Sequence, residues 1–125
     1  MRFLFVCVEN SCRSQMAEGF ARALGVHARS AGSRPSGVVN RKAIRSMAEV
    51  GIDLSAHRSK SLTEAGPGPY DAIVTMGCGD RCDEVDTAHR LEWDIPDPKH
   101  LDAERFGAVR ERIRAEVERL VHGSP

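Results

Sequence analysis

The stretch that decides the fold is residues 3–14, FLFVCVENSCRS. Its first four residues form an apolar run that predicts a short buried strand. After the stretch, apolar residues recur at helical spacing until Gly25 ends the predicted helix; they are Met16, Ala17, Phe20 and Leu24. Residues 7–14 therefore form a loop that joins a strand to a helix, which is the first unit of an α/β fold.

The rest of the chain repeats this alternation. Residues 70–76 (YDAIVTM) and 91–95 predict two more strands, and a helix is predicted from Asn40 to Gly51. A long amphipathic helix follows, with apolar positions at Phe106, Val109, Ile113, Val117 and Leu120. The pattern predicts an α/β fold with a parallel sheet and helices on both faces. Without a linker or repeat, residues 1–125 are expected to form a single domain.

Composition excludes several classes of protein. The chain has 125 residues, 41% of them hydrophobic, which fits a globular domain and not a disordered chain. Its net charge is zero, whereas non-specific nucleic-acid binders are usually basic. No apolar run approaches membrane-spanning length, and the start lacks a signal-peptide pattern. We expect a cytoplasmic monomer that binds neither nucleic acid nor membrane.

Residues 7–14 have the spacing of an oxyanion site, and we call them the anion loop. A loop of this length can curl around a tetrahedral anion and present its backbone N–H groups, assisted by the helix that follows. Arg13 supplies a bidentate guanidinium, and Cys7 is placed as a nucleophile whose thiolate these donors and Ser14 stabilise. Alternatively, Cys7 is a buried strand residue and Arg13 a surface one. The predicted anion-binding residues are Val8, Glu9, Asn10, Ser11, Cys12, Arg13 and Ser14.

Two further segments follow predicted strands, so they are expected at the same edge of the sheet as Cys7. Cys78 and Cys82 lie in a glycine-containing loop and are candidates for a disulfide, a zinc half-site or two inert thiols. Zinc is disfavoured because no second ligand pair is present, although His89 is nearby. Asp97, between two prolines, is a candidate proton donor, with Asp94 as the competitor. Cys12 is interpreted as a packing thiol or, alternatively, as a thiol that traps Cys7.

The chain resembles arsenate reductases of the low-molecular-weight phosphatase fold. The resemblance covers nearly the whole chain, in segments 7–19 (CVENSCRSQMAEG), 30–32 (SAG), 51–62 (GIDLSAHRSKSL), 75–82 (TMGCGDRC) and 93–98 (WDIPDP). It implies a four-stranded parallel sheet with the anion loop after the first strand. Low-molecular-weight tyrosine phosphatases share this loop. They usually have Pro where this chain has Gln15 and aromatics where it has Lys99 and His100, so reductase is favoured.

The resemblance implies a thiol relay. Cys7 forms an adduct with arsenate, Asp97 protonates the leaving oxygen, and Cys78 and then Cys82 take over the disulfide. Thioredoxin, or glutaredoxin with a low-molecular-weight thiol such as glutathione or mycothiol, is the implied reductant, and phosphate or sulfate competes with arsenate. In some members the two relay cysteines are separated by six residues, but here by three. The alternatives are a tyrosine phosphatase and a non-catalytic anion-binding or redox-sensing module.

Some relatives bind potassium beside the loop through an Asn, a Glu, the Ser of SAG and an acid. Asn10, Glu18 and Ser30 match that set, whereas Lys60 stands at the position of the acid. We expect the Lys60 ammonium to replace the ion, and therefore no required metal and no cofactor.

Overall fold

The computed structural model describes residues 1–77 and 87–123. The strands are β1 (Arg2–Cys7), β2 (His27–Gly32), β3 (Tyr70–Met76) and β4 (Thr87–Trp93). The helices are α1 (Arg13–Ala23), α2 (Arg41–Ala48), α3 (Leu62–Ala65) and α4 (Ala103–Val121). The strands form one parallel sheet in the order β2-β1-β3-β4, which confirms the predicted fold class.

The central strand β1 brings the functional loop to the carboxyl edge of the sheet. It pairs with β2 from Arg2↔His27 to Cys7↔Gly32 and with β3 on its other side. Its residues from Phe3 to Cys7 are all buried, as the apolar run predicts. Because all four strands run in one direction, the loops after β1, β3 and β4 emerge at the same edge.

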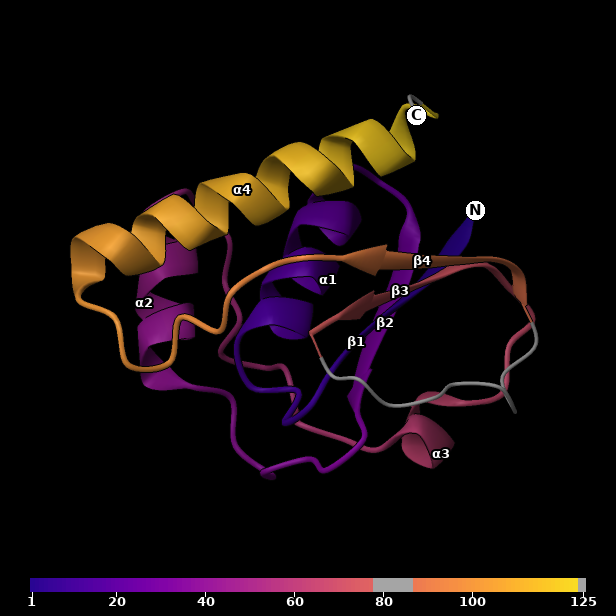
Figure 1. Cartoon of the computed structure of the whole chain (residues 1–125), viewed down its shortest axis with the longest axis horizontal. Coiled ribbons are helices and arrows are strands. Elements are labelled where there is room, and N and C mark those ends of the chain that lie inside the picture. Colours follow the sequence, from indigo (N-terminus) through magenta and orange to yellow (C-terminus); the bar gives the residue numbers. More distant parts are fainter. Residues whose placement is uncertain (78–86, 124–125) are drawn as a thin grey trace.

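Helices cover the two faces of the sheet unequally. Figure 1 shows α1, α2 and α4 grouped on one side of the sheet and the short α3 on the other. The larger core lies under the three helices and includes Phe5, Met16 and Ile113. The smaller core lies towards α3 and includes Leu4, Val6 and Ile73. The anion loop therefore starts from a strand that is buried on both faces.

The structure corrects the predicted elements at the edges of the sheet. The strand expected at residues 91–95 is instead β4 (Thr87–Trp93), which begins earlier because exposed polar residues extend it. Ile95 is buried in the turn that follows. The residue pattern does not predict β2, because this strand is a mixture of polar and small residues, and it does not predict α3, which has only four residues. The helix expected from Asn40 is confirmed, since the Asn40 side chain caps α2 by accepting a hydrogen bond from the Lys42 N–H.

Within residues 1–77 and 87–123, no helix has both the length and the apolar character needed to cross a membrane.

Candidate active site

The anion loop is held by its carbonyl groups. The Val8 carbonyl accepts a hydrogen bond from the Arg34 N–H at 2.8 Å, the Glu9 carbonyl from Ser36, and the Ser11 carbonyl from Asn40. Within the described residues, no backbone N–H of residues 9–12 donates a hydrogen bond to the protein. The neighbouring segment therefore fixes the loop from outside and leaves those N–H groups for an anion.

Close packing behind the loop also fixes its path. Asn10 has φ = 53°, a left-handed conformation that Asn tolerates better than most residues. Gly32 packs so closely behind the loop that a Cβ there would lie 2.6 Å from the Val8 carbonyl oxygen. The glycine of the SAG segment is thus required by the approach of the loop and not by its own dihedral angles.

Cys7 sits at the base of the loop beside a chain of polar side chains. Its Sγ lies 2.9 Å from the Ser14 Oγ, and the Asn10 side chain donates to that same hydroxyl oxygen at 2.8 Å. Asn10 Oδ1 in turn accepts from Gln15 Nε2 and from the Lys60 N–H. When Cys7 is a thiolate its sulfur can only accept a hydrogen bond, so the Ser14 hydroxyl donates to it and stabilises the charge.

Arg13 begins α1 and lies against the segment that follows β4. Its Nη1 donates to the Ile95 carbonyl at 3.1 Å, and its Nη2 lies 3.9 Å from Asp97 Oδ2. The Arg13 side chain is 8% exposed, whereas that of Asp97 is 51% exposed. Gly77 has φ = +66°, and a Cβ there would meet Arg13 Nη1 at 2.6 Å. The loop after β3 therefore leaves room for the guanidinium by having glycine at this position.

These residues enclose a pocket of about 490 Å³ at the carboxyl edge of the sheet. Cys7, Cys12 and Arg13 line it from the anion loop, and Asp97 lines it from the segment after β4. Asp94, the competing acid of the sequence prediction, is not among the residues that line this pocket. A tetrahedral oxyanion held here has a thiol, a guanidinium and a carboxyl group around it, which are the groups for nucleophilic attack and proton transfer.

A buried carboxylate lies next to the loop. Glu18 accepts a hydrogen bond from Ser30, and Arg22 Nη2 lies 3.0 Å and Lys60 Nζ 3.8 Å from its carboxylate. Burial lowers the pKa of Lys60. The Lys60 ammonium thus lies beside Glu18, and its replacement of a potassium ion stays a prediction. Two cationic side chains already face this one carboxylate, and this charge balance is the basis for expecting no potassium there. Independence from metal stays a prediction.

The second thiol of the loop has a different environment. Cys12 is 3% exposed, and burial raises the pKa of its thiol to about 11. At neutral pH it is a protonated packing group, in agreement with the interpretation that it packs in the loop.

The structure brings Cys7, Arg13 and Asp97 together, as their positions after strands and in the loop predict. Cys78 and Cys82 lie outside the described residues, so the disulfide relay stays a prediction. Two features were not recognised in the sequence: the role of Gln15 in holding Asn10, and an ion pair between Glu9 and Lys99. Gln15 follows the loop directly, and this position could have indicated a contact with the loop. The ion pair joins residues far apart in sequence, so no local pattern indicates it.

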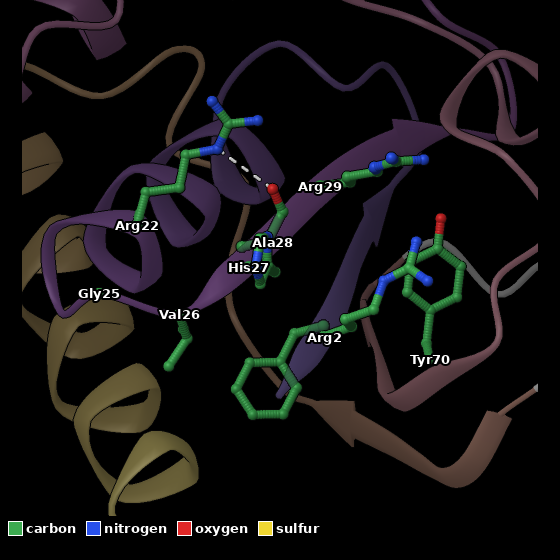
Figure 2. A pocket seen from close by; sticks show the side chains of 9 residues that line it. Arg2, Arg22, Gly25, Val26, His27, Ala28, Arg29 and Tyr70 are labelled. Atoms are coloured by element: carbon green, nitrogen blue, oxygen red, sulfur yellow. Dashed lines mark hydrogen bonds between the residues drawn. The ribbon is translucent and has the colours of Figure 1, made fainter.

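A larger pocket of about 630 Å³ lies where the strands begin, and Arg2, Arg22 and Arg29 line it. Figure 2 shows the Arg22 guanidinium on the α1 side of β2, away from those of Arg2 and Arg29. Arg22 Nε donates to the Ala28 carbonyl, and Arg29 Nη1 donates to the Ala65 carbonyl. None of the residues that line this pocket is a cysteine or a carboxylic acid.

The model of the low-molecular-weight phosphotyrosine protein phosphatase family matches residues 2–123, nearly the whole chain. The chain belongs to this family. Within the family, the chain is 36% identical to a glutaredoxin arsenate reductase from Synechocystis sp., with 96% of this chain and 95% of that protein covered. It is 38% identical to arsenate reductase 1 from Staphylococcus epidermidis, with 94% and 93% covered.

A solved family structure, described as an arsenate reductase in the phosphate binding state, superimposes with a TM-score of 0.89. It is 36% identical in sequence, and the match covers 99% of this chain and 98% of that one. The fold expected from the resemblance, a four-stranded parallel sheet with the anion loop after the first strand, is therefore confirmed.

Proposed function

We propose that the protein is an arsenate reductase that converts arsenate to arsenite through a Cys7 adduct and a disulfide relay from Cys78 to Cys82. The observation that carries the proposal is the meeting of Cys7, Arg13 and Asp97 at one pocket in a chain that also has Cys78 after β3. The similarity to arsenate reductases from two bacteria supports the same activity.

In the first step, the anion loop binds arsenate and Cys7 attacks it. The loop N–H groups and the Arg13 guanidinium hold the non-reacting oxygens, and the Ser14 hydroxyl stabilises the attacking thiolate. A bond forms between the Cys7 sulfur and arsenic. An arsenic–oxygen bond breaks, and Asp97 protonates the departing oxygen, which leaves as water. Asp97 suits this role because it reaches the pocket while remaining half exposed and open to proton exchange with solvent.

In the second step, electrons pass from two thiols to arsenic. The Cys78 thiolate attacks the Cys7 sulfur, the sulfur–arsenic bond breaks, and its electron pair stays on arsenic, which leaves as arsenite. A Cys7–Cys78 disulfide results. Cys82 then attacks Cys78, which frees Cys7 and leaves a Cys78–Cys82 disulfide. Thioredoxin, or glutaredoxin with a low-molecular-weight thiol, reduces this disulfide in the proposed cycle, which requires no cofactor.

The second candidate is a tyrosine phosphatase, which the family relationship favours. The same attack on a phosphate ester gives a phosphocysteine that water can hydrolyse without Cys78 or Cys82. We place it second because Lys99 and His100 follow the Asp97-Pro98 turn, where no Phe, Tyr or Trp is present to pack on a phosphotyrosine ring.

The test is arsenate-dependent NADPH oxidation with thioredoxin and its reductase, and separately with glutathione, glutaredoxin and glutathione reductase. We expect turnover with at least one system and none for Cys7→Ser, since a serine oxygen cannot enter a disulfide. Cys82→Ser should stop the relay after a single turnover. Steady turnover by Cys82→Ser with thioredoxin would exclude the relay. Efficient aryl phosphate hydrolysis, unaffected by Cys78→Ser and without arsenate reduction, would instead establish the phosphatase.

A further inference from the structure

An ion pair links Glu9, which lines the Cys7 pocket, to Lys99 in the turn after Asp97. Lys99 Nζ lies 3.1 Å and 3.0 Å from the two carboxylate oxygens of Glu9. Glu9 belongs to the anion loop, and Lys99 follows Asp97 by two residues, so the contact joins the two segments that supply the nucleophile and the acid. The side chains are 37% and 38% exposed, respectively, so Glu9 lines the pocket at its rim and not at its floor, and Lys99 lies outside it against the Glu9 carboxylate.

Both partners are anchored through their backbones. The Glu9 carbonyl accepts hydrogen bonds from the Ser36 N–H and from Ser59 Oγ. The Lys99 N–H donates to Asp97 Oδ1 at 3.0 Å, and its carbonyl accepts from Lys42 Nζ. The ion pair therefore ties the anion loop to a turn that also orients the Asp97 carboxylate.

The charges explain why an acidic residue is tolerated in an anion-binding loop. A lone carboxylate at Glu9 would repel a bound oxyanion, and Lys99 neutralises it locally. The hydrogen bond to Glu9, followed by its negative charge, raises the pKa of Lys99, which keeps the Lys99 ammonium charged at neutral pH. Since the pair is neutral overall, its main contribution at the rim is the space it occupies and the segments it joins.

We propose that the Glu9–Lys99 pair closes the mouth of the Cys7 pocket beside Asp97 and selects small free oxyanions over aryl phosphate esters. The proposal rests on the Cys7 pocket as the oxyanion site of the proposed function, but not on the redox steps. The leaving group lies opposite the attacking Cys7 sulfur and next to Asp97, which protonates it. Free arsenate or phosphate has only an oxygen there, whereas an ester must place its aromatic ring at this rim.

The test removes the pair and its bulk without changing net charge, in the double variant Glu9→Ala/Lys99→Ala. The matched control is Glu116→Ala/Arg119→Ala, which removes an ion pair of 2.6 Å on α4. The readout is the rate of Cys7 alkylation by iodoacetamide, followed by peptide mass spectrometry. Inorganic phosphate and phenyl phosphate are titrated as protecting ligands, so the measurement needs no arsenate turnover.

In the double variant, we expect phenyl phosphate to gain about tenfold in protection relative to inorganic phosphate. The control should keep the wild-type ratio. The single variant Lys99→Gln leaves Glu9 unpaired and should weaken protection by both ligands. This variant therefore distinguishes repulsion of the anion by the Glu9 carboxylate from loss of the steric barrier to an ester.

An unchanged ratio of protection by the two ligands in the double variant would overturn the proposal. Failure of phosphate to protect Cys7 even in the wild type would overturn the oxyanion site itself, and with it the proposed function. Protection without arsenate reduction would contradict the reductase proposal alone.

Discussion

The Cys7 pocket and the arginine-lined pocket where the strands begin differ in a way that explains which of them is suited to chemistry. The larger pocket has three arginines, and their guanidinium groups are held by separate partners, which are the Ala28 carbonyl, the Ala65 carbonyl and the Tyr70 ring. The smaller pocket has one arginine, beside backbone N–H groups and a thiol. An oxyanion site differs from a pocket that merely contains arginines because its hydrogen-bond donors converge on one point; the number of cations does not decide it.

Replacing one arginine in each pocket tests this contrast, and we expect it to give the largest difference in activity between two variants. Arg13→Ala should lower kcat/KM for arsenate by about 10²- to 10³-fold, because the oxyanion loses its charged donor. Arg29→Ala should change it by less than about twofold, since Arg29 donates to Ala65 at the far edge of the sheet. Equal losses for the two variants, measured as initial rates of arsenite formation, would remove the distinction between the pockets.

A smaller loss is expected when the acid is replaced. Asp97→Asn should reduce kcat by about 10²-fold, because the amide cannot donate the proton that the leaving oxygen needs. Asp94→Asn is the matched control, since Asp94 does not line the Cys7 pocket. Pre-steady-state rates of adduct formation would measure the step. If Asp94→Asn were the more damaging substitution, the assignment of the acid would be reversed.

The rigidity of the anion loop predicts an effect on stability. Asn10→Ala removes the bonds to Ser14, Gln15 and the Lys60 N–H, and it places alanine at φ = 53°. We expect a loss of about 3 kcal/mol in the free energy of unfolding. Asn10→Gly should recover about 1 kcal/mol of this, because glycine accepts the left-handed conformation. Urea unfolding measures both values, and equal values would mean that the dihedral angle contributes nothing.

The smallest expected effect concerns pH. The raised pKa of Cys12, about 11, predicts that this thiol stays protonated through pH 9 and reacts slowly with iodoacetamide. Its alkylation rate should stay low and rise about tenfold per pH unit without levelling off below pH 10, because the thiolate fraction grows in that proportion below the pKa. Peptide mass spectrometry over pH 6–10 would follow it, with Cys7 as the internal comparison. Rapid labelling of Cys12 near neutral pH would place its thiol in a polar, reactive environment instead.

The elements that the sequence predicts best are those formed by buried, locally patterned residues. The run at residues 3–6 and the helical spacing after Arg13 define β1, the anion loop and α1, because apolar periodicity is a local property. The edge strand β2 lacks such a run, and β4 is exposed along most of its length, so its start was missed.

Long-range polar contacts were the features that sequence reasoning missed. Glu9 and Lys99 are 90 positions apart, and no local pattern pairs them. The contacts of Gln15 with Asn10 and with the Arg58 carbonyl also depend on the tertiary fold. By contrast, Cys7 and Asp97 were predictable together because both follow strands of a parallel sheet, whose carboxyl ends share one edge.

The central claim is that Cys7 delivers electrons from the protein's own thiols to bound arsenate. Its most direct test is a single turnover of fully reduced protein with arsenate, after all external thiol has been removed. The wild type should release about one arsenite per chain and gain a Cys78–Cys82 disulfide, and Cys7→Ser should release none. Arsenite release by Cys7→Ser at the wild-type level would contradict the account. So would the absence of arsenite release from wild-type protein in which bound arsenate protects Cys7 from alkylation.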